Sequence, residues 1–284
     1  MDAIIKKFFV VIILVLLVMS SQIVSAEDWS SIRNFSSKSD LARWIENGRR
    51  NGQTEFNFTL TNMNVTVDEL TNEIANDGGS KLLPPDPNSI NYYTYYVNEL
   101  PGTRVANAYL SGDTSKLTAE EMKLYIEAIR IVMAAREYSY DAVERERYIH
   151  DEICKRSKPI SIGDENRYYR DENEDYIRDK NGFKKLKPFA TAIGVLNNGY
   201  NGEAICSGYS DAFYMLCRMC ELDVVRIGGK NINSGNGHGW NAIKLNGAVY
   251  FVDVFWDDEG NSDEFFNKSA EFFRQEHAWN YVAF

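Results

Sequence analysis

The chain has 284 residues, a formal net charge of −10 and 44% apolar residues. That length and apolar content suit a folded protein with a buried core and exclude a disordered chain. An acidic protein repels phosphate backbones, so nucleic acid is excluded as an expected partner. The 4 cysteines are too few for a small disulfide scaffold.

The first 26 residues are typical of a secretory signal peptide. Lys6 and Lys7 precede an unbroken apolar run over residues 8–19, and Ala26 ends a stretch of small residues that suits a cleavage site. The run is shorter than the roughly 20 residues of a membrane-spanning helix. We therefore expect a mature chain from Glu27 that is secreted or held in the cell envelope, without a membrane anchor. An uncleaved N-terminal anchor is the alternative.

Residues 27–113 are expected to form a small α/β domain of unknown role. A serine that can cap a helix and apolar residues along one side predict a helix from Ser39 to Asn47. The other predicted elements are a strand over 55–60, a helix over 66–75, a proline-rich loop at 84–87, and two strands at 91–97 and 103–110 that pair with each other.

Residues 114–284 are expected to form the catalytic domain. Thr118 and Glu121 have the spacing of a capping box, and they predict a largely buried helix after them. A second helix is predicted over residues 141–154. A charged surface loop over 163–187 and a short helix over 188–196 follow.

Cys206 is predicted to lie at or just before the start of a helix, because apolar residues recur at helical spacing after it. A thiol reacts as the thiolate, and the positive end of a helix dipole stabilises that anion. Backbone N–H groups of the first turn can serve as an oxyanion hole. Position alone would favour a structural cysteine.

His238 strengthens the case for a nucleophilic thiol at Cys206. It is one of 3 histidines, and it precedes a stretch of alternating residues that predicts a strand. A thiol nucleophile needs a base that takes its proton and returns it to the leaving group, and histidine does both near neutral pH. Without Cys206 upstream, a hydrogen-bonded histidine at a strand edge would be the default interpretation.

Asp253 is predicted to contact His238 across a β-hairpin. Asn246 and Gly247 both tolerate positive φ and predict a two-residue turn, which brings Trp240 opposite Asp253. Since side chains alternate along a strand, Asp253 then lies diagonally across from His238 on the same face. A three-residue loop would move it to the other face. Asp257 and Asp258 are competing candidates to orient the histidine.

Cys217 and Cys220 form a C-x-x-C pair, the pattern of a redox site or half of a zinc site. They fall late in a predicted helix rather than at its start, and no second pair completes a metal-ligand set. We expect them to be small core residues. No metal and no cofactor are predicted.

Three motifs together resemble the core of the bacterial transglutaminase-like superfamily. They are AICSGYS over residues 204–210, GHGWN over 237–241 and YFVDVFWDD over 250–258. The resemblance extends from about Thr118 to the last residue. It departs from the family where valine and phenylalanine follow Asp253 in place of proline and threonine. Ser207 also stands where tissue-type members place a tryptophan.

The resemblance implies an α+β fold with a papain-like core: a helix bearing Cys206 packs on an antiparallel sheet bearing His238 and Asp253. It implies a nucleophile, a general base and an orienting acid in that order. The candidates for substrate binding or the oxyanion hole are Ser207, Gly208, Tyr209 and Trp240. The departure at Ser207, with no calcium-loop pattern in the chain, argues against calcium-dependent protein cross-linking.

The leading interpretation is an exported cysteine enzyme that acts on amide bonds of a protein or peptide, with cell-wall peptide included, through an acyl-thioester. Water as acceptor makes it a peptidase or amidase, and an amine makes it a transglutaminase. The resemblance favours hydrolysis. The alternative from another class is a non-catalytic binding or cell-surface module that keeps the fold. A thiol oxidoreductase that uses Cys217 and Cys220 is a weaker third interpretation.

Overall fold

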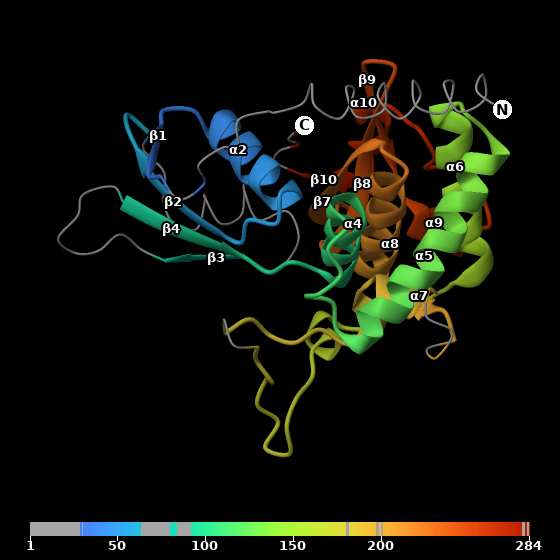
Figure 1. The fold of residues 1–284 in the computed structure, drawn as a ribbon, viewed down its shortest axis with the longest axis horizontal. Helices are drawn as coiled ribbons and strands as arrows, with labels where there is room; N and C mark the ends of the chain where they lie inside the picture. The colour runs from blue at the N-terminus through green and yellow to red at the C-terminus, as the bar shows by residue number, and fades with distance from the viewer. Residues whose placement is uncertain are drawn as a thin grey trace, which may run out of the picture.

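The computed structural model describes residues 29, 31–63, 80–83, 92–179, 182–196, 199, 201–279, 282 and 284. The predicted signal peptide, the predicted helix over 66–75 and the proline-rich loop at 84–87 lie outside these residues. The described chain is α+β, with a four-stranded sheet and its helix on one side of Figure 1 and a larger helix-and-sheet body on the other. No helix among the described residues is long and apolar enough to cross a membrane.

The smaller sheet has the strand order β1-β2-β4-β3. Its elements are β1 (Arg33–Phe35), α2 (Lys38–Arg50), β2 (Glu55–Leu60), β3 (Ser80–Leu83) and β4 (Tyr92–Val97). Trp44 of α2 packs on Phe56 and Phe58 of β2, so the helix and sheet share an apolar core. The predicted strand over 55–60 is confirmed. Ser37 caps α2, in place of the predicted Ser39.

The predicted strand over residues 103–110 is wrong, because these residues belong to helix α4 (Pro101–Ser111). Pro101 presets the φ of the first helical turn, and Gly112 ends the helix in the left-handed conformation. Val105 and Ala106 of α4 are buried in the core of the larger body. The division between the two predicted domains at residue 113 stays a prediction, and these contacts group α4 with the C-terminal part.

Helices α5 (Ala119–Tyr138) and α6 (Ala142–Arg156) pack together in the larger body (Figure 1). The predicted capping box is confirmed. The hydroxyl of Thr118 accepts from the backbone N–H of Glu121, and the Glu121 carboxylate accepts from the backbone N–H of Thr118 at 2.9 Å. Two backbone donors that a helix start leaves without intrahelical acceptors are thereby satisfied.

Replacing Thr118 with alanine is expected to destabilise the protein by about 1 kcal/mol, because the Glu121 N–H loses its acceptor. Urea unfolding followed by circular dichroism measures this change. Ser115→Ala, in the exposed turn before the helix, is the control and is expected to stay within about 0.5 kcal/mol of the parent. Equal stability of the Thr118 variant and the parent would contradict the role of the cap.

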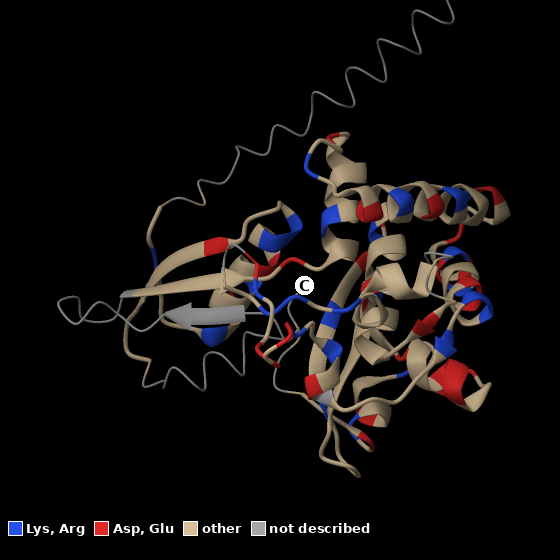
Figure 2. Ribbon diagram, turned by 90° about the horizontal axis from the view of Figure 1, so that it is seen from below, with Lys and Arg blue, Asp and Glu red and all other residues tan. Residues whose placement is uncertain are grey.

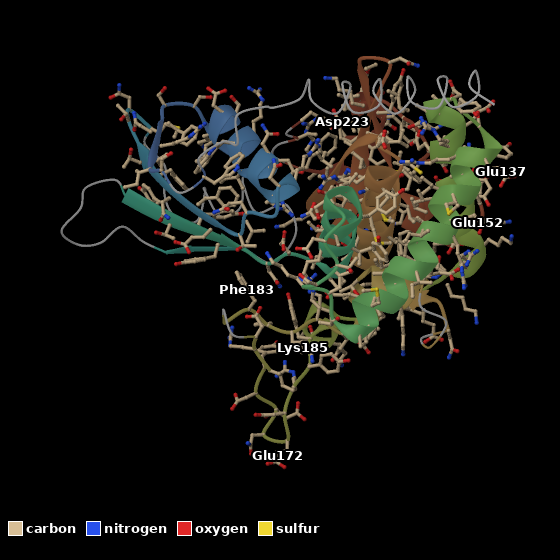
Figure 3. The ribbon with its side chains drawn as sticks, in the orientation of Figure 1. Glu137, Glu152, Glu172, Phe183, Lys185 and Asp223 are labelled. Atoms are coloured by element: carbon tan, nitrogen blue, oxygen red, sulfur yellow. The ribbon has the colours of Figure 1, made fainter. Side chains whose placement is uncertain are left out.

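Residues 163–179 and 182–187 project from the body as an extension, with Glu172 at its far end in Figure 3. Beyond η1 (Asp164–Arg167), isolated bridges join Tyr168 to Leu186 and Arg178 to Lys184, so part of the predicted loop is a small folded meander. The segment after it returns as η2 (Pro188–Ala190) and α7 (Ala192–Leu196) beneath α8. The short strands β5 (Lys158–Pro159) and β6 (Glu203–Ala204) pair beside it.

Helix α8 (Cys206–Met219) packs against the second sheet, whose strand order is β10-β7-β8-β9. Its strands are β7 (Asp223–Asn231), β8 (Gly237–Leu245), β9 (Ala248–Val252) and β10 (His277–Ala278), and the helices α9 (Val254–Gly260) and α10 (Ala270–Phe273) follow β9. The predicted hairpin is confirmed: Leu245 pairs with Ala248, and both turn residues have positive φ. This register brings the ends of β8 and β9 together.

Polar contacts join the part of the chain with the smaller sheet to the larger body. The guanidinium of Arg50 on α2 lies 2.7 Å from the Asp223 carboxylate at the start of β7, and it also donates to the carbonyl of Val224. Figure 2 shows acidic and basic residues interspersed over both parts. The smaller sheet is thus joined to the sheet that carries His238.

Candidate active site

Cys206 is the first residue of α8, as the sequence predicts, and its side chain is partly exposed. The preceding residue, Ile205, is extended and has no side-chain cap, so the thiol lies at the open start of the helix. The close approach of α8 to the segment below it depends on Gly208. A Cβ at that position would lie 2.7 Å from the carbonyl oxygen of Phe189.

His238 and Asp253 make the contact that the hairpin register predicts. Nε2 of His238 lies 2.5 Å from Oδ2 of Asp253, and both side chains are buried. β9 ends at Val252, and Asp253 is the residue that caps α9. Its Oδ1 accepts from the backbone N–H of Trp256 at 3.2 Å. The carboxylate is therefore held by the helix it caps while it binds the histidine.

The electrostatics of this pair favour an imidazolium at His238. Burial alone would lower the pKa of His238, but the charge and hydrogen bond of Asp253, with a hydrogen bond to Cys206, raise the pKa to about 10. Burial likewise opposes ionisation of Asp253, yet the two histidines that bind it hold its pKa well below the usual range. Since Nε2 faces Asp253, Nδ1 of His238 is the nitrogen left for the thiol.

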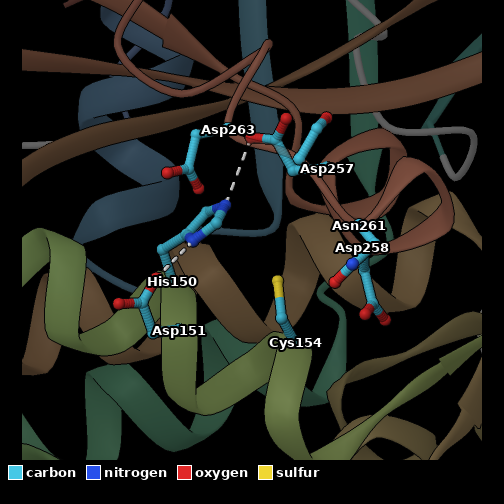
Figure 4. Close-up of a pocket in the computed structure, with 8 residues that line it drawn as sticks. His150, Asp151, Cys154, Asp257, Asp258, Asn261 and Asp263 are labelled. Atoms are coloured by element: carbon cyan, nitrogen blue, oxygen red, sulfur yellow. Dashed lines mark hydrogen bonds and ion pairs between the residues drawn. The ribbon is translucent and has the colours of Figure 1, made fainter.

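Asp257 and Asp258, the other candidates to orient His238, bind different groups. Asp257 binds Nε2 of His150 at 3.2 Å and accepts from the backbone N–H of Phe265. Asp258 accepts from the hydroxyl of Tyr209. The first of these contacts borders an open pocket of about 280 Å³, and Figure 4 shows His150 bonded to Asp257 and to Asp151 there.

The oxyanion candidates differ in what their donors bind. The backbone N–H groups of Gly208 and Tyr209 both donate to the carbonyl of Ile205, at 2.9 and 3.2 Å. The hydroxyl of Ser207 donates to the carbonyl of Ala190. The indole N–H of Trp240 is buried and has no hydrogen-bond partner within the described chain. Of the predicted first-turn donors, the N–H of Ser207 is the one that an open helix start leaves for a ligand.

The other three cysteines lie in environments that suppress thiol reactivity. Cys217 and Cys220 are buried in the core, as predicted, and all four thiols are free. Burial raises the pKa of Cys217 and of Cys220. Burial, with the negative charges of Asp257 and Asp258 among others, also raises the pKa of Cys154. Cys206 is thus the thiol that combines partial exposure with a histidine partner.

His277 is a site residue that the sequence reasoning missed. It starts β10, is fully buried, and its Nε2 lies 3.0 Å from the same Asp253 oxygen that binds His238. No local pattern marks it, because 24 residues separate it from Asp253. Its scarcity, as one of 3 histidines, is the signal that could have found it.

A buried ion pair joins the elements that position the site. Asp211 of α8 lies 2.9 Å from the guanidinium of Arg226 on β7, and its other oxygen accepts from the backbone N–H groups of Gly102 and Ala192, at 3.0 Å each. Burial raises the pKa of Asp211 even with these partners. One carboxylate therefore ties together the start of α4, the start of α7, helix α8 and strand β7.

Two groups of side chains in the described part of the chain are spaced closely enough to bind a metal ion. One is His238, Asp253 and His277, and the other is His150, Asp151 and Asp263. The first group is already joined by hydrogen bonds. In the second, the guanidinium of Arg147 lies 3.5 Å from Asp151 and 2.7 Å from Asp263, which supplies a positive charge without a metal.

No family model matches the chain, and no curated protein matches it. Among solved structures, one described as a TGase is similar over 79% of this chain and 59% of that one, at 10% sequence identity and a TM-score of 0.36. The present chain therefore spans about three-fifths of that structure.

Proposed function

We propose that the protein is a cysteine-dependent enzyme that acts on amide bonds through an acyl-thioester, with the papain-like arrangement of the transglutaminase-like superfamily. The observation that carries the proposal is the contact chain from the Cys206 thiol through His238 to the buried carboxylate of Asp253. A partly exposed thiol at a helix start, next to a histidine oriented by a carboxylate, is the arrangement that thiol nucleophiles require.

The proposed first step is acylation. The Cys206 thiolate attacks the amide carbonyl, and the backbone N–H of Ser207 is the candidate donor to the oxyanion. When the tetrahedral intermediate collapses, the carbon–nitrogen bond breaks and the His238 imidazolium gives its proton to the departing amine. The product is an acyl-thioester on Cys206 with a neutral His238.

The second step releases the acyl group. Neutral His238 takes a proton from water or from an amine as that acceptor attacks the thioester, and Cys206 departs as the thiolate. Water gives hydrolysis and an amine gives transfer. We favour hydrolysis, of a protein or of cell-wall peptide, because the family resemblance favours it. We favour an exported protein because the N-terminal sequence is typical of a secretory signal.

The test incubates the reduced protein with a glutamine-containing peptide and with cell-wall peptide fragments, each with and without a primary amine, and reads the products by mass spectrometry. Cys206→Ser is the control. We expect Cys206-dependent products that stay hydrolysed when the amine is present; an amine adduct would instead assign transfer.

Iodoacetamide labelling of the folded, reduced protein tests the thiol itself. Cys206 is expected to react far faster than Cys154, Cys217 or Cys220. Equal, slow labelling of all four would contradict the proposal. Fast labelling of Cys206 without turnover of any acyl donor would favour a binding module that keeps the site.

A further inference from the structure

The Asp253 carboxylate binds two histidines through one oxygen. Nε2 of His238 lies 2.5 Å from Oδ2 and Nε2 of His277 lies 3.0 Å from the same atom. The other oxygen, Oδ1, accepts from the backbone N–H of Trp256. Three donors thus fix the position and the rotation of a carboxylate that is 1% exposed.

The hydrogen bonding determines which nitrogen of His277 carries a proton. An ionised carboxylate only accepts hydrogen bonds, so Nε2 of His277 must donate to Asp253. Nδ1 of His277 is buried and has no hydrogen-bond partner within the described chain. An imidazolium would leave a buried N–H donor without an acceptor there, which is costly. A neutral ring with its proton on Nε2 avoids that cost.

Aromatic rings keep His277 in place. Trp256, Trp240 and Phe273 lie with their ring centroids 4.2, 4.6 and 4.6 Å from that of His277. Trp256 also stacks on His238 at 4.8 Å. Because this cage excludes water and leaves little room for rotation, the hydrogen bond from His277 acts on Asp253 as a fixed constraint.

We propose that His277 is a positioning residue, which fixes Oδ2 of Asp253 so that the carboxylate holds the proton of His238 on Nε2 and leaves Nδ1 facing Cys206. This inference rests on the proposed function. Without the His277 donor, Asp253 can rotate about its side-chain bond, and His238 gains access to the tautomer with its proton on Nδ1. That tautomer cannot accept a proton from the thiol.

Two substitutions separate positioning from packing. His277→Phe keeps a ring in the cage but removes the donor, and His277→Gln supplies an amide N–H close to the position of Nε2. The readout is the pH profile of Cys206 alkylation by iodoacetamide. We expect the Phe variant to react at least about tenfold more slowly than the parent at pH 6, since thiolate formation loses its oriented partner. We expect the Gln variant to stay within about threefold of the parent.

The outcomes distinguish this inference from the proposed function. Slow labelling of Cys206 in the unmodified protein overturns the proposed function. Fast labelling there, with the same pH profile in His277→Phe, overturns the positioning role alone. So does an equal loss in both variants, because a purely structural role would respond to packing and not to the donor.

A second measurement reads the ring of His277 directly in the unmodified protein. Nitrogen-15 NMR of histidine-labelled protein is expected to show His277 with its proton on Nε2 and none on Nδ1. The chain has 3 histidines, so the His277→Gln and His150→Gln spectra suffice for assignment. A proton on Nδ1 of His277 would overturn the inference.

Discussion

Replacing His238 with alanine is expected to reduce kcat/KM for amide-bond turnover by roughly 10²–10⁴-fold. The variant keeps the thiol at the start of α8 but loses the group that protonates the leaving amine. The alkylation of Cys206 should change as well. The pKa of His238, raised against the opposing effect of burial to about 10 by the charge and hydrogen bond of Asp253 and by Cys206, keeps an imidazolium beside the thiol through neutral pH, and the variant removes that cation.

In the His238→Ala variant, the alkylation of Cys206 at neutral pH is expected to be at least about tenfold slower than in the parent, because the thiolate loses its cationic partner. His150→Ala is the matched control, because His150 is also buried and also bound to an aspartate. It should leave the alkylation rate of Cys206 unchanged. Equal rates in the parent and the His238 variant would show that the histidine does not act on the thiol.

Replacing Asp211 with alanine is expected to destabilise the protein by about 3–5 kcal/mol. Arg226 would then keep its charge in the core without its carboxylate, and the backbone N–H groups of Gly102 and Ala192 would lose their acceptor. Such a loss is a large part of the stability of an ordinary domain. The midpoint of urea unfolding, read by circular dichroism, measures it.

Two comparisons make the Asp211 experiment specific. Glu221→Ala breaks an ion pair with Arg136 in which Glu221 is 72% exposed, and it should cost less than about 1 kcal/mol. The double change Asp211→Leu with Arg226→Leu removes both charges and should recover part of the stability lost in Asp211→Ala. A loss of stability in Asp211→Ala as small as that in Glu221→Ala would contradict the structural role of the buried ion pair.

The parts of the structure that the sequence predicted well depend on local patterns. Asn246 and Gly247 required a two-residue turn, and once the turn was known the period of two brought Asp253 to His238. The Thr118 capping box likewise depends on a spacing of three residues. The α+β class, which the family resemblance implied, agrees with the structure. The catalytic roles of Cys206, His238 and Asp253 stay predictions.

Contacts between distant segments escaped prediction for physical reasons. The stretch over 103–110 contains residues that suit a strand or a helix, and burial against α8 decided for the helix. The sequence does not distinguish Asp211 from other helical aspartates, because its partner Arg226 lies 15 residues further along the chain. The position of His277 depends on the pairing of β10 with β7, and no turn motif in the sequence predicts that pairing.

Gly229 limits which sequence changes near the site are compatible with the fold. It pairs with His238 across the sheet, and a Cβ there would clash with the carbonyl oxygen of Ala278 and with the ring of Trp240. Any larger residue would push β10 outward and take His277 with it. Among descendants of a common ancestor, glycine at this position and histidine at 277 should therefore be retained together or lost together.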